Sequence, residues 1–376
     1  MMQRPLKVLM TADAVGGVWS YCLTLARAMQ AYGVQYTLAC MGPRPSRDQV
    51  ADAAALANVR LEVSDYRLEW MTEPWADVEA AGEWLRSLEA RDGPDLVHLN
   101  GYAHGACGFA GPAVVVGHSC CLSWWRAVKG GEAPPEWDEY RAQVSRGIAC
   151  ADAFIAPSAA ILAEYQRLYR RLPRAQVIHN AADVPSVHGL RKEQAVLAAG
   201  RAWDEAKNIG VVAEAAAHIP WPTRIAGDTR GPVGSAVLPA TVQQLGRLSQ
   251  REMQEALARA AIYVHPARYE PFGLLPLEAA HQGCALVLAD IPTLRELWSE
   301  AAVFFDPTDS GALVRSVRGL INSPERLAAC ARAAARQAQC YSVARFGAAY
   351  AHLYSQLVET TNGSDTCGSH SSTTRC

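Results

Sequence analysis

The sequence predicts an α/β protein made of two consecutive Rossmann-like, doubly wound domains. Short apolar runs alternate with helical patterns almost throughout, which is typical of a parallel sheet with helices on both faces. The alternation breaks at 180–189, a segment that contains Pro185 and Gly189 and lacks helical periodicity, and then restarts. We therefore expect one domain at 1–184 and a second at 190–340, joined by a linker.

The first domain begins with a strand at Lys7–Met10 and a helix that ends at Gly33. The helix has an apolar face of Val18, Cys22, Leu25 and Met29. The other strands expected in this domain are Val34–Cys40, Val59–Val63, Leu96–Leu99, Ala113–Gly117, Phe154–Ala156 and Val177–Ile178. Those expected in the second domain are Gln194–Ala199, Arg224–Ala226, Val242–Leu245, Ile262–Val264, Leu286–Leu288 and Val303–Phe305.

The C-terminal part carries an apolar stripe that predicts a last helix within 341–360. The stripe consists of Phe346, Tyr350, Leu353 and Leu357. The segment 361–376 is rich in Ser, Thr and Gly and has no periodicity, so we expect it to be disordered.

Composition excludes several classes of function. The formal net charge is −2 over 376 residues, so the chain has no overall basic field and we expect no nucleic-acid partner. No apolar run approaches the roughly 20 residues of a membrane-spanning helix. Because Met1–Met10 leads directly into the first strand and does not resemble a signal peptide, we expect a cytoplasmic protein. The 11 cysteines include no Cys-x-x-Cys pair, which argues against a zinc site.

The most informative stretch is Arg268–Ala280, where Glu270 and Glu278 bracket a turn that opens a predicted helix. The turn consists of Phe272, Gly273, Leu274 and Leu275. A helix N-terminus presents free N–H groups and the positive end of the helix dipole, which suits a phosphate group. The two glutamates would accept hydrogen bonds from the hydroxyls of a sugar and a ribose. The alternative is that both lie on a solvated helix face.

The spacing of Glu270 and Glu278 resembles the glutamate–seven–glutamate signature of the retaining glycosyltransferases of family 4. This resemblance implies the GT-B architecture, in which two Rossmann-like domains face each other across a cleft and the last helix crosses back to the N-terminal domain. It also implies a nucleotide-diphosphate sugar donor, with an acceptor that the sequence does not identify. The chain departs from the family pattern at Pro271 and Ala181, where most members have glycine.

Two cations follow the expected strand that ends at Ala199. Gly200-Arg201 comes directly after this strand, and Lys207 follows six residues later. In open α/β sheets, ligands bind beyond the carboxyl ends of the strands. The pair resembles the family's diphosphate clamp, which implies that Arg201 and Lys207 stabilise the departing diphosphate. No Asp-x-Asp triplet is present, so we expect neither a metal nor a cofactor. The alternative is two exposed surface cations.

Two histidines fall on strands of the first domain. His118 follows the strand at 113–117, and the resemblance implies that it faces the donor sugar. A histidine at a strand end is otherwise more often structural. His98 lies within the strand 96–99 and matches a looser family pattern, which assigns it to the acceptor.

Gly16 and Gly17 connect the first strand to the first helix. Glycines let the backbone approach a ligand, and the helix N-terminus suits a phosphate or a hydroxyl. The family places a similar Gly-Gly-Val here, which assigns both glycines to donor binding, although a plain turn explains them equally well. Asp13 in the same loop is assigned to the acceptor.

Trp124 begins an aromatic and basic patch that ends at Lys129. The patch would stack on a sugar acceptor or contact the inner face of a membrane peripherally. The alternative is packing within the N-terminal domain. The oligomeric state stays open.

These residues together predict a metal-independent, retaining hexosyltransferase. Glu270 would hold the donor sugar, and Glu278 would hold the nucleotide ribose. Two other functions are compatible with the same fold: a nucleotide-sugar epimerase and a non-catalytic nucleotide-sugar binding subunit. The epimerase would need no acceptor, and the binding subunit would not need to stabilise a leaving group.

Overall fold

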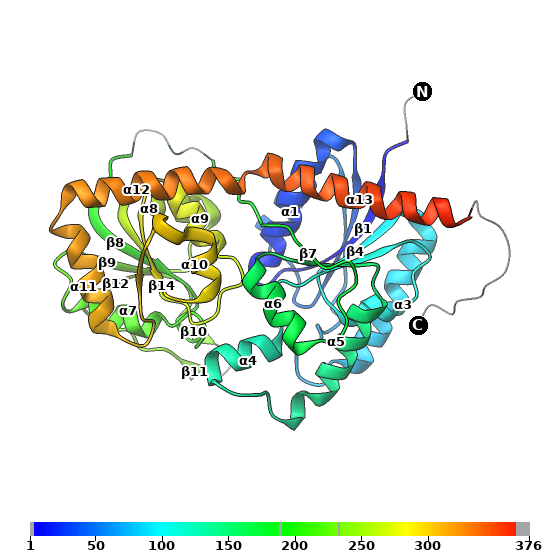
Figure 1. Cartoon of the computed structure of the whole chain (residues 1–376), viewed down its shortest axis with the longest axis horizontal. Helices are drawn as coiled ribbons and strands as arrows, with labels where there is room; N and C mark the ends of the chain where they lie inside the picture. Colours follow the sequence, from blue (N-terminus) through cyan, green and yellow to red (C-terminus); the bar gives the residue numbers. More distant parts are fainter. Residues whose placement is uncertain (1–3, 186, 188–189, 232–233, 366–376) are drawn as a thin grey trace. The chain divides into compact units, whose positions relative to one another are not determined.

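The computed structural model describes residues 4–185, 187, 190–231 and 234–365 (Figure 1). The chain forms two compact units. Unit 1 contains the chain up to Trp125, the segment Glu132–Ala181 and the chain from Val343, and unit 2 contains Arg126–Gly131 and Ala182–Ser342. Each unit holds its own parallel sheet flanked by helices, so the predicted α/β class with two Rossmann-like domains is confirmed.

The sheet of unit 1 has the strand order β3-β2-β1-β4-β5-β6-β7. Its strands are β1 (Lys7–Asp13), β2 (Gln35–Met41), β3 (Val59–Val63), β4 (Leu96–Leu99), β5 (Ala113–Val116), β6 (Ala153–Ala156) and β7 (Gln176–Val177). All their pairings are parallel. The strand order reverses between β1 and β4, and ligands of such sheets bind at this switch point. Asp13 ends β1 and Asn100 follows β4 at this point.

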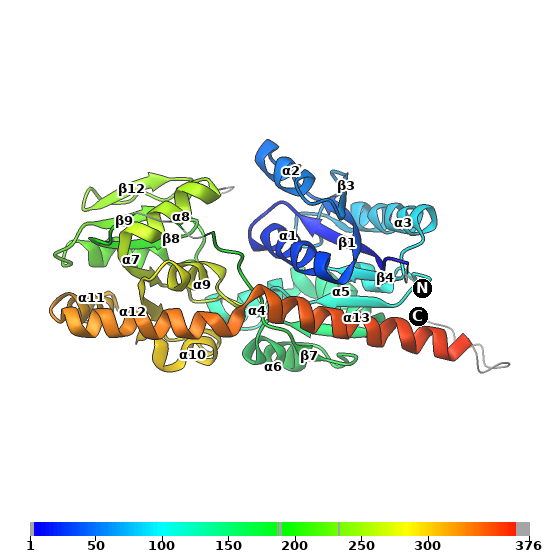
Figure 2. The same cartoon turned by 90° about the horizontal axis from the view of Figure 1, so that it is seen from above.

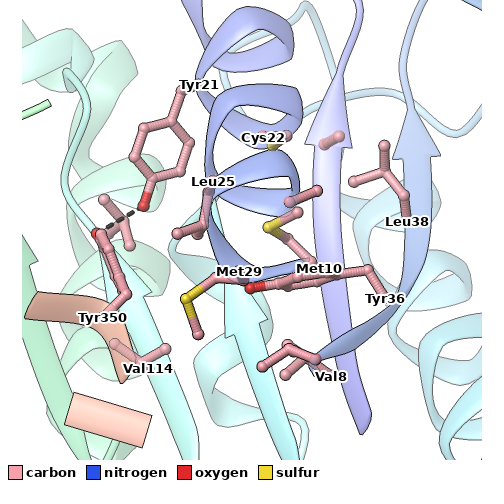
Figure 3. Close-up of a cluster of buried hydrophobic side chains, with 14 of the residues drawn as sticks. Val8, Met10, Tyr21, Cys22, Leu25, Met29, Tyr36, Leu38, Val114 and Tyr350 are labelled. Atoms are coloured by element: carbon pink, nitrogen blue, oxygen red, sulfur yellow. Dashed lines mark hydrogen bonds between the residues drawn. The ribbon is translucent and has the colours of Figure 1, made fainter. Parts of the chain in front are cut away.

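The helices that begin in unit 1 are α1 (Gly17–Met29), α2 (Arg47–Ala54), α3 (Trp75–Asp92), α4 (Cys121–Lys129), α5 (Asp138–Cys150), α6 (Ala159–Leu168) and α13 (Val343–Asp365). Helices α1 and α13 pack side by side (Figures 1 and 2). Their apolar faces join Val8 and Met10 of β1 in one buried cluster (Figure 3). Within it, the Tyr21 hydroxyl donates to the Tyr350 hydroxyl at 2.5 Å. This packing explains why the stripe on α13 is apolar.

Helix α13 is longer than the sequence predicts. It continues to Asp365, so the expectation of disorder is wrong for 361–365. Once the apolar stripe is docked, each further residue extends an existing helix and needs no new nucleus. The rest of the expected tail, 366–376, lies outside the described residues.

The sheet of unit 2 has the strand order β12-β9-β8-β13-β14-β15. Its strands are β8 (Glu193–Ala199), β9 (Thr223–Ala226), β12 (Val242–Gly246), β13 (Ala260–His265), β14 (Ala285–Ala289) and β15 (Val303–Phe305). The pairings are again parallel, and the order reverses between β8 and β13. A short antiparallel pair, β10 (Arg230–Gly231) and β11 (Gly234–Ser235), is an addition that the sequence did not predict.

Helices cover both faces of this second sheet. They are α7 (Ile209–Ala216), α8 (Gln250–Arg259), α9 (Leu274–His281), α10 (Pro292–Trp298), α11 (Ser310–Ile321) and α12 (Pro324–Ala338). Val196 and Ala198 of β8 pack in the cluster that holds α7 and α11, whereas Leu197 and Ala199 pack in the cluster that holds α9 and α12. Because successive strand residues point to opposite faces, a strand covered on both sides must be apolar at every position. This accounts for the unbroken apolar run in β8.

Candidate active site

The candidate site of unit 2 lies at the carboxyl ends of β8 and β13, where the strand order reverses. Val264 of β13 pairs with Ala198 of β8, so the loops that follow these strands begin side by side. The backbone N–H of Arg268 donates to the carbonyl of Ala206 at 2.8 Å and fastens one loop to the other. Lys207 and Glu270, which are 63 residues apart in the chain, are brought together by this arrangement.

Glu270 is held by two donors. The Lys207 ammonium donates to its Oε2 at 2.8 Å, and Nε2 of His265 donates to the same oxygen at 3.0 Å. The side chain of Glu270 is 13% exposed and that of Lys207 is 26% exposed. Burial alone would raise the pKa of Glu270, but the Lys207 charge and the His265 hydrogen bond hold it well below its usual value. Glu270 is therefore a fixed carboxylate.

Arg201 is fixed within the loop that follows β8. Its guanidinium donates to Oδ2 of Asp204 at 2.7 Å and 3.3 Å, and it lies 5.3 Å from the centre of the Trp203 ring. The other oxygen of Asp204 accepts from the backbone N–H of Ala206. With 40% of its side chain exposed, Arg201 remains accessible to an anion.

The predicted helix is present as α9, which begins at Leu274, within the segment that the sequence assigned to the turn, and Gly273 precedes it with φ 90°. A side chain at Gly273 would be strained by this backbone angle and would bring a Cβ to 3.1 Å from Pro276. No side chain in the described part of the chain caps this helix. The N–H groups of Leu274 and Leu275 therefore point out of the first turn as donors for an anion.

Phe272 does not fit its predicted role. Its side chain is part of the buried core, with the residue 3% exposed, and its ring meets Tyr341 edge-on at 5.4 Å. The side chain therefore supports the loop and does not touch a donor. The apolar nature of this position reflects packing, which the motif alone does not distinguish from ligand contact.

Glu278 lies on α9 and has a different environment from Glu270. Its Oε2 accepts from the Gln254 side-chain amide of α8 at 2.6 Å. Gln254 in turn accepts from the side chain of Gln282 at 2.8 Å. Burial raises the pKa of Glu278 to about 7, with the Gln254 hydrogen bond opposing this shift. Glu278 thus titrates near neutral pH, unlike Glu270.

His118 of unit 1 is half-buried and lies two residues after the end of β5. Its Nε2 donates to Oδ1 of Asn100 at 2.7 Å, while the Asn100 amide nitrogen donates to the carbonyl of Thr11. Burial lowers the pKa of His118 to about 3, so the ring is neutral and its Nδ1 is an acceptor. Within the described residues Nδ1 has no partner, yet it is not enclosed. His118 therefore offers an acceptor to a hydroxyl group.

His98 does not fit its predicted contact with an acceptor. It is 0% exposed, and its ring nitrogens lie 2.7 Å from the Tyr354 hydroxyl and 3.3 Å from the Tyr21 hydroxyl. Burial, together with the nearby His118, lowers the pKa of His98 to about 3. Because Tyr354 belongs to α13, His98 is a structural residue that ties this helix to the sheet.

The remaining predicted residues of unit 1 lie in the loop after β1, except for Trp124. Gly16 has φ 82° and precedes α1, and both Gly16 and Gly17 are exposed. The Asp13 carboxylate accepts from the backbone N–H of Val15 at 2.8 Å, and burial raises its pKa to about 6. Trp124 lies on α4, where it is half-buried and meets Trp125 edge-on at 6.2 Å.

Three residues of these sites were missed by sequence reasoning: His265, Gln254 and Asn100. His265 and Asn100 lie at the ends of predicted strands, so the rule that ligands bind at strand ends was sufficient to find them. Gln254 carried no such signal, because its contact with Glu278 depends on the packing of α8 against α9.

The described residues contain neither a metal-binding cluster nor a membrane-spanning helix. No group of three or more His, Cys, Asp or Glu side chains is arranged to hold a metal ion in the described ranges. None of the described helices has the length and hydropathy needed to cross a bilayer.

Comparison with protein families gives two matches that follow one another along the chain. Residues 15–185 match the model for Glycosyltransferase Family 4, and residues 183–337 match the model for Glycosyl transferases group 1. Glycogen synthase of Mycobacterium tuberculosis is 38% identical over 92 residues. That match covers only 24% of this chain and 22% of the mycobacterial protein.

Solved structures resemble almost the whole chain. Sucrose-phosphate synthase from Thermosynechococcus elongatus is 16% identical with a TM-score of 0.77, and the match covers 94% of this chain and 100% of that structure. HepE of Anabaena in complex with UDP and glucose is 17% identical with a TM-score of 0.71, over 94% of this chain and 100% of that structure. At these identities the resemblance establishes a shared GT-B fold.

Proposed function

Because the chain belongs to the GT-B glycosyltransferases of family 4, we propose that it transfers a hexose from a nucleotide-diphosphate sugar with retention of anomeric configuration and without a metal ion. One observation carries this proposal. Lys207, the fixed carboxylate of Glu270 and the open N-terminus of α9 occur together at the switch point of unit 2. Lys207 and the helix N-terminus can bind phosphate oxygens, and the Glu270 carboxylate can accept hydrogen bonds from sugar hydroxyls. Together these groups suit a phosphorylated sugar.

The leaving diphosphate is assigned to the positive groups of the site. When the bond between the sugar's anomeric carbon and the phosphate oxygen breaks, negative charge develops on the diphosphate. Arg201, Lys207 and the N–H groups of Leu274 and Leu275 stabilise that charge, since fixed donors act most strongly where charge develops in the transition state. Arg201 and Lys207 supply the positive charge that a metal ion provides in other transferases.

The two glutamates are assigned to the sugar and to the ribose. Glu270 is ionised, so it accepts hydrogen bonds from the hydroxyls of the transferred hexose. Glu278 accepts from the ribose of the nucleotide. In unit 1, the open Nδ1 of His118 accepts from a sugar hydroxyl. No described side chain is assigned as a covalent nucleophile, so the acceptor hydroxyl attacks from the face that the diphosphate leaves and its proton passes to a phosphate oxygen.

The nature of the donor is supported by the structural relatives. HepE, which has the same fold, was solved with UDP and glucose. The backbone amides that bind a diphosphate do not depend on the nucleotide base, so a UDP-sugar and a GDP-sugar both fit the groups described above. The acceptor is selected by loops that vary freely on a shared scaffold.

Ligand binding is tested first. Thermal denaturation is measured with UDP, GDP and their glucose and mannose conjugates, because a ligand that binds the native state raises the melting temperature. Product analysis with and without added sugars separates transfer from epimerisation, which needs no acceptor. Slow hydrolysis of the donor without an acceptor argues against a non-catalytic binding subunit.

Catalysis is tested with Glu270→Gln, which keeps the shape of the side chain and removes its charge. We expect transfer or donor hydrolysis to fall by about 10²-fold or more, because an interaction with the reacting sugar is lost. The melting temperature of the unligated variant and the affinity for free diphosphate serve as controls for folding. Full turnover by a folded Glu270→Gln variant would refute this assignment.

A further inference from the structure

We propose that His265 is a positioning residue of the transferase site, which holds Glu270 in place while Lys207 engages the leaving diphosphate. The inference rests on the proposed function of this site. His265 ends β13, and Glu270 follows five residues later in the loop. Three points carry the assignment: the carboxylate oxygen that His265 contacts, the burial of His265 compared with that of Lys207, and the ring nitrogen that carries the proton.

Both donors to Glu270 meet the same carboxylate oxygen. Lys207 Nζ lies 2.8 Å and His265 Nε2 lies 3.0 Å from Oε2. The second oxygen, Oε1, has no partner in the described part of the chain and is not enclosed. The carboxylate is thus fixed through one oxygen and open through the other. A sugar hydroxyl can bind Oε1 without displacing either donor.

Lys207 and His265 differ in how firmly they are held. Lys207 carries its charge on a flexible stem with 26% of the side chain exposed, so it can turn towards a bound diphosphate. The His265 side chain is 3% exposed and stands at the end of a central strand. When the diphosphate attracts Lys207, His265 therefore remains to fix Glu270. A carboxylate that loses its orientation at this step would lose its contact with the sugar.

The hydrogen bonds define the tautomer of His265. An ionised carboxylate only accepts, so Nε2 carries the proton that is donated to Glu270. Burial raises the pKa of Tyr263 well above its usual value, so its hydroxyl stays protonated. In a neutral ring Nδ1 is then an acceptor, and the Tyr263 hydroxyl, 3.4 Å away, is placed to donate to it. Tyr263 thereby keeps the proton on Nε2, where Glu270 needs it.

A comparison with His98 separates this role from ordinary core packing. Both histidines are buried at strand positions and both contact tyrosine hydroxyls. The partners of His98 are tyrosines on both ring nitrogens, and it stabilises the packing of unit 1. In contrast, His265 directs its Nε2 to the carboxylate that is assigned to the reacting sugar.

The test compares His265→Leu, which removes the donor, with His265→Gln, whose amide restores a donor near the position of Nε2. His218→Gln on an exposed residue of unit 2 is the matched control. Turnover is measured as nucleoside diphosphate released from UDP-glucose, UDP-mannose, GDP-glucose and GDP-mannose. We expect His265→Leu to lower kcat by about 10- to 100-fold, as loss of a supporting hydrogen bond behind a reacting group does. His265→Gln should recover much of this loss, and His218→Gln should match the wild type.

Two further readouts distinguish positioning from a loss of structure. The Kd for UDP or GDP should stay unchanged in His265→Leu, because these ligands lack the sugar that Glu270 contacts. The acidic limb of kcat/KM should move to higher pH. Glu270 must be ionised, its pKa is held low by Lys207 and His265, and the Tyr263 hydroxyl is the other titratable group facing this pair. Removing His265 raises the pKa of Glu270, so activity is lost at a higher pH as the solution is acidified.

The outcomes separate the two proposals. An active wild type together with a His265→Leu variant of unchanged kcat and unchanged acidic limb overturns the role of His265 alone. If kcat falls together with an equal loss of diphosphate affinity, and His265→Gln does not recover either, His265 has a purely structural role. That result also overturns the positioning role. If His265→Leu does not fold, Tyr263→Phe must shift the acidic limb in the same direction, and an unmoved limb overturns the role. A wild type that neither turns over nor binds any of these nucleotides overturns the proposed function and this inference with it.

Discussion

The two units share one strand order. The hydrogen-bonded pair at the switch point of unit 1 is neutral, however, whereas the pairs at the switch point of unit 2 are charged. In unit 1, burial keeps His118 neutral, and its hydrogen-bond partner Asn100 carries no charge. In unit 2, Lys207 pairs with Glu270, whose pKa is held well below its usual value, and Arg201 pairs with Asp204. The same topology therefore supports a neutral hydrogen-bonding site in one unit and a charged site in the other.

The difference arises from the partners that the loops supply. Burial penalises a charge unless an opposite charge or strong hydrogen bonds compensate it. Glu270 has Lys207 within 2.8 Å, whereas the hydrogen bond that His118 makes within the described ranges is to the neutral amide of Asn100. Charged groups suit a diphosphate, and neutral acceptors suit hydroxyls. Mutations that remove charge should therefore be costly in unit 2 and mild in unit 1.

The largest effect is expected for Lys207→Gln. This change removes the cation that is assigned to the leaving phosphate and leaves Glu270 with His265 as its remaining donor. We expect kcat to fall by about 10²- to 10³-fold, because charge stabilisation in the transition state is lost. Steady-state kinetics of donor turnover measure the loss. Arg318→Gln, which removes an exposed cation from α11, is the control and should retain wild-type rates. If Lys207→Gln and Arg318→Gln turned over at equal rates, the charge of Lys207 would have no role in the mechanism.

Much of this fold could be predicted because it depends on local pattern. Central parallel strands are covered on both faces, so they appear as continuous apolar runs such as Ala195–Ala199 within the predicted strand Gln194–Ala199. The pair β10 and β11 escaped prediction, since strands of two residues have no periodicity to detect. The extent of α13 also escaped, because the docking that stabilises it on α1 is a long-range contact.

The candidate site was predictable only where a motif fixes spacing. Glu270 was identified by its spacing to Glu278, and Lys207 by its place after a strand and its resemblance to the family's diphosphate clamp; the structure brings the two together. His98 looked similar to His118 in sequence, since both belong to strands of the same sheet. Their difference depends on which side chains cover them: Tyr354 of α13, 256 residues away, closes over His98. A contact of that range leaves no trace in the local sequence.

An intermediate effect is expected at His118, which tests the neutral character of unit 1. His118→Leu removes the acceptor nitrogen and should lower kcat by about 10-fold, the order of one neutral hydrogen bond. His118→Asn restores an acceptor oxygen near the position of Nδ1 and should recover part of the rate. The pKa of His118 is about 3, so neither variant should change the rate profile between pH 6 and 7. If the wild-type rate changed with pH between 6 and 7 and this change were absent in His118→Asn, His118 would be charged during turnover.

The smallest effect is expected at Glu278, a buried acidic residue of unit 2 that has no cationic partner among its described contacts. Burial raises its pKa to about 7 from the usual 4.5, so the folded state favours the protonated form. Its contribution to stability is fully present below pH 4.5 and is lost as the pH rises through 7.

Glu278→Gln cannot ionise, so its free energy of unfolding should fall less than that of the wild type between pH 5 and pH 8.5. The expected difference is on the order of 2 kcal/mol, measured by urea denaturation at the two pH values. Asp13 and Glu69 also have pKa values raised by burial and contribute equally to both proteins, so the difference isolates Glu278. If both proteins lost the same stability, Glu278 would be ionised throughout, and the contrast between the two glutamates of unit 2 would disappear.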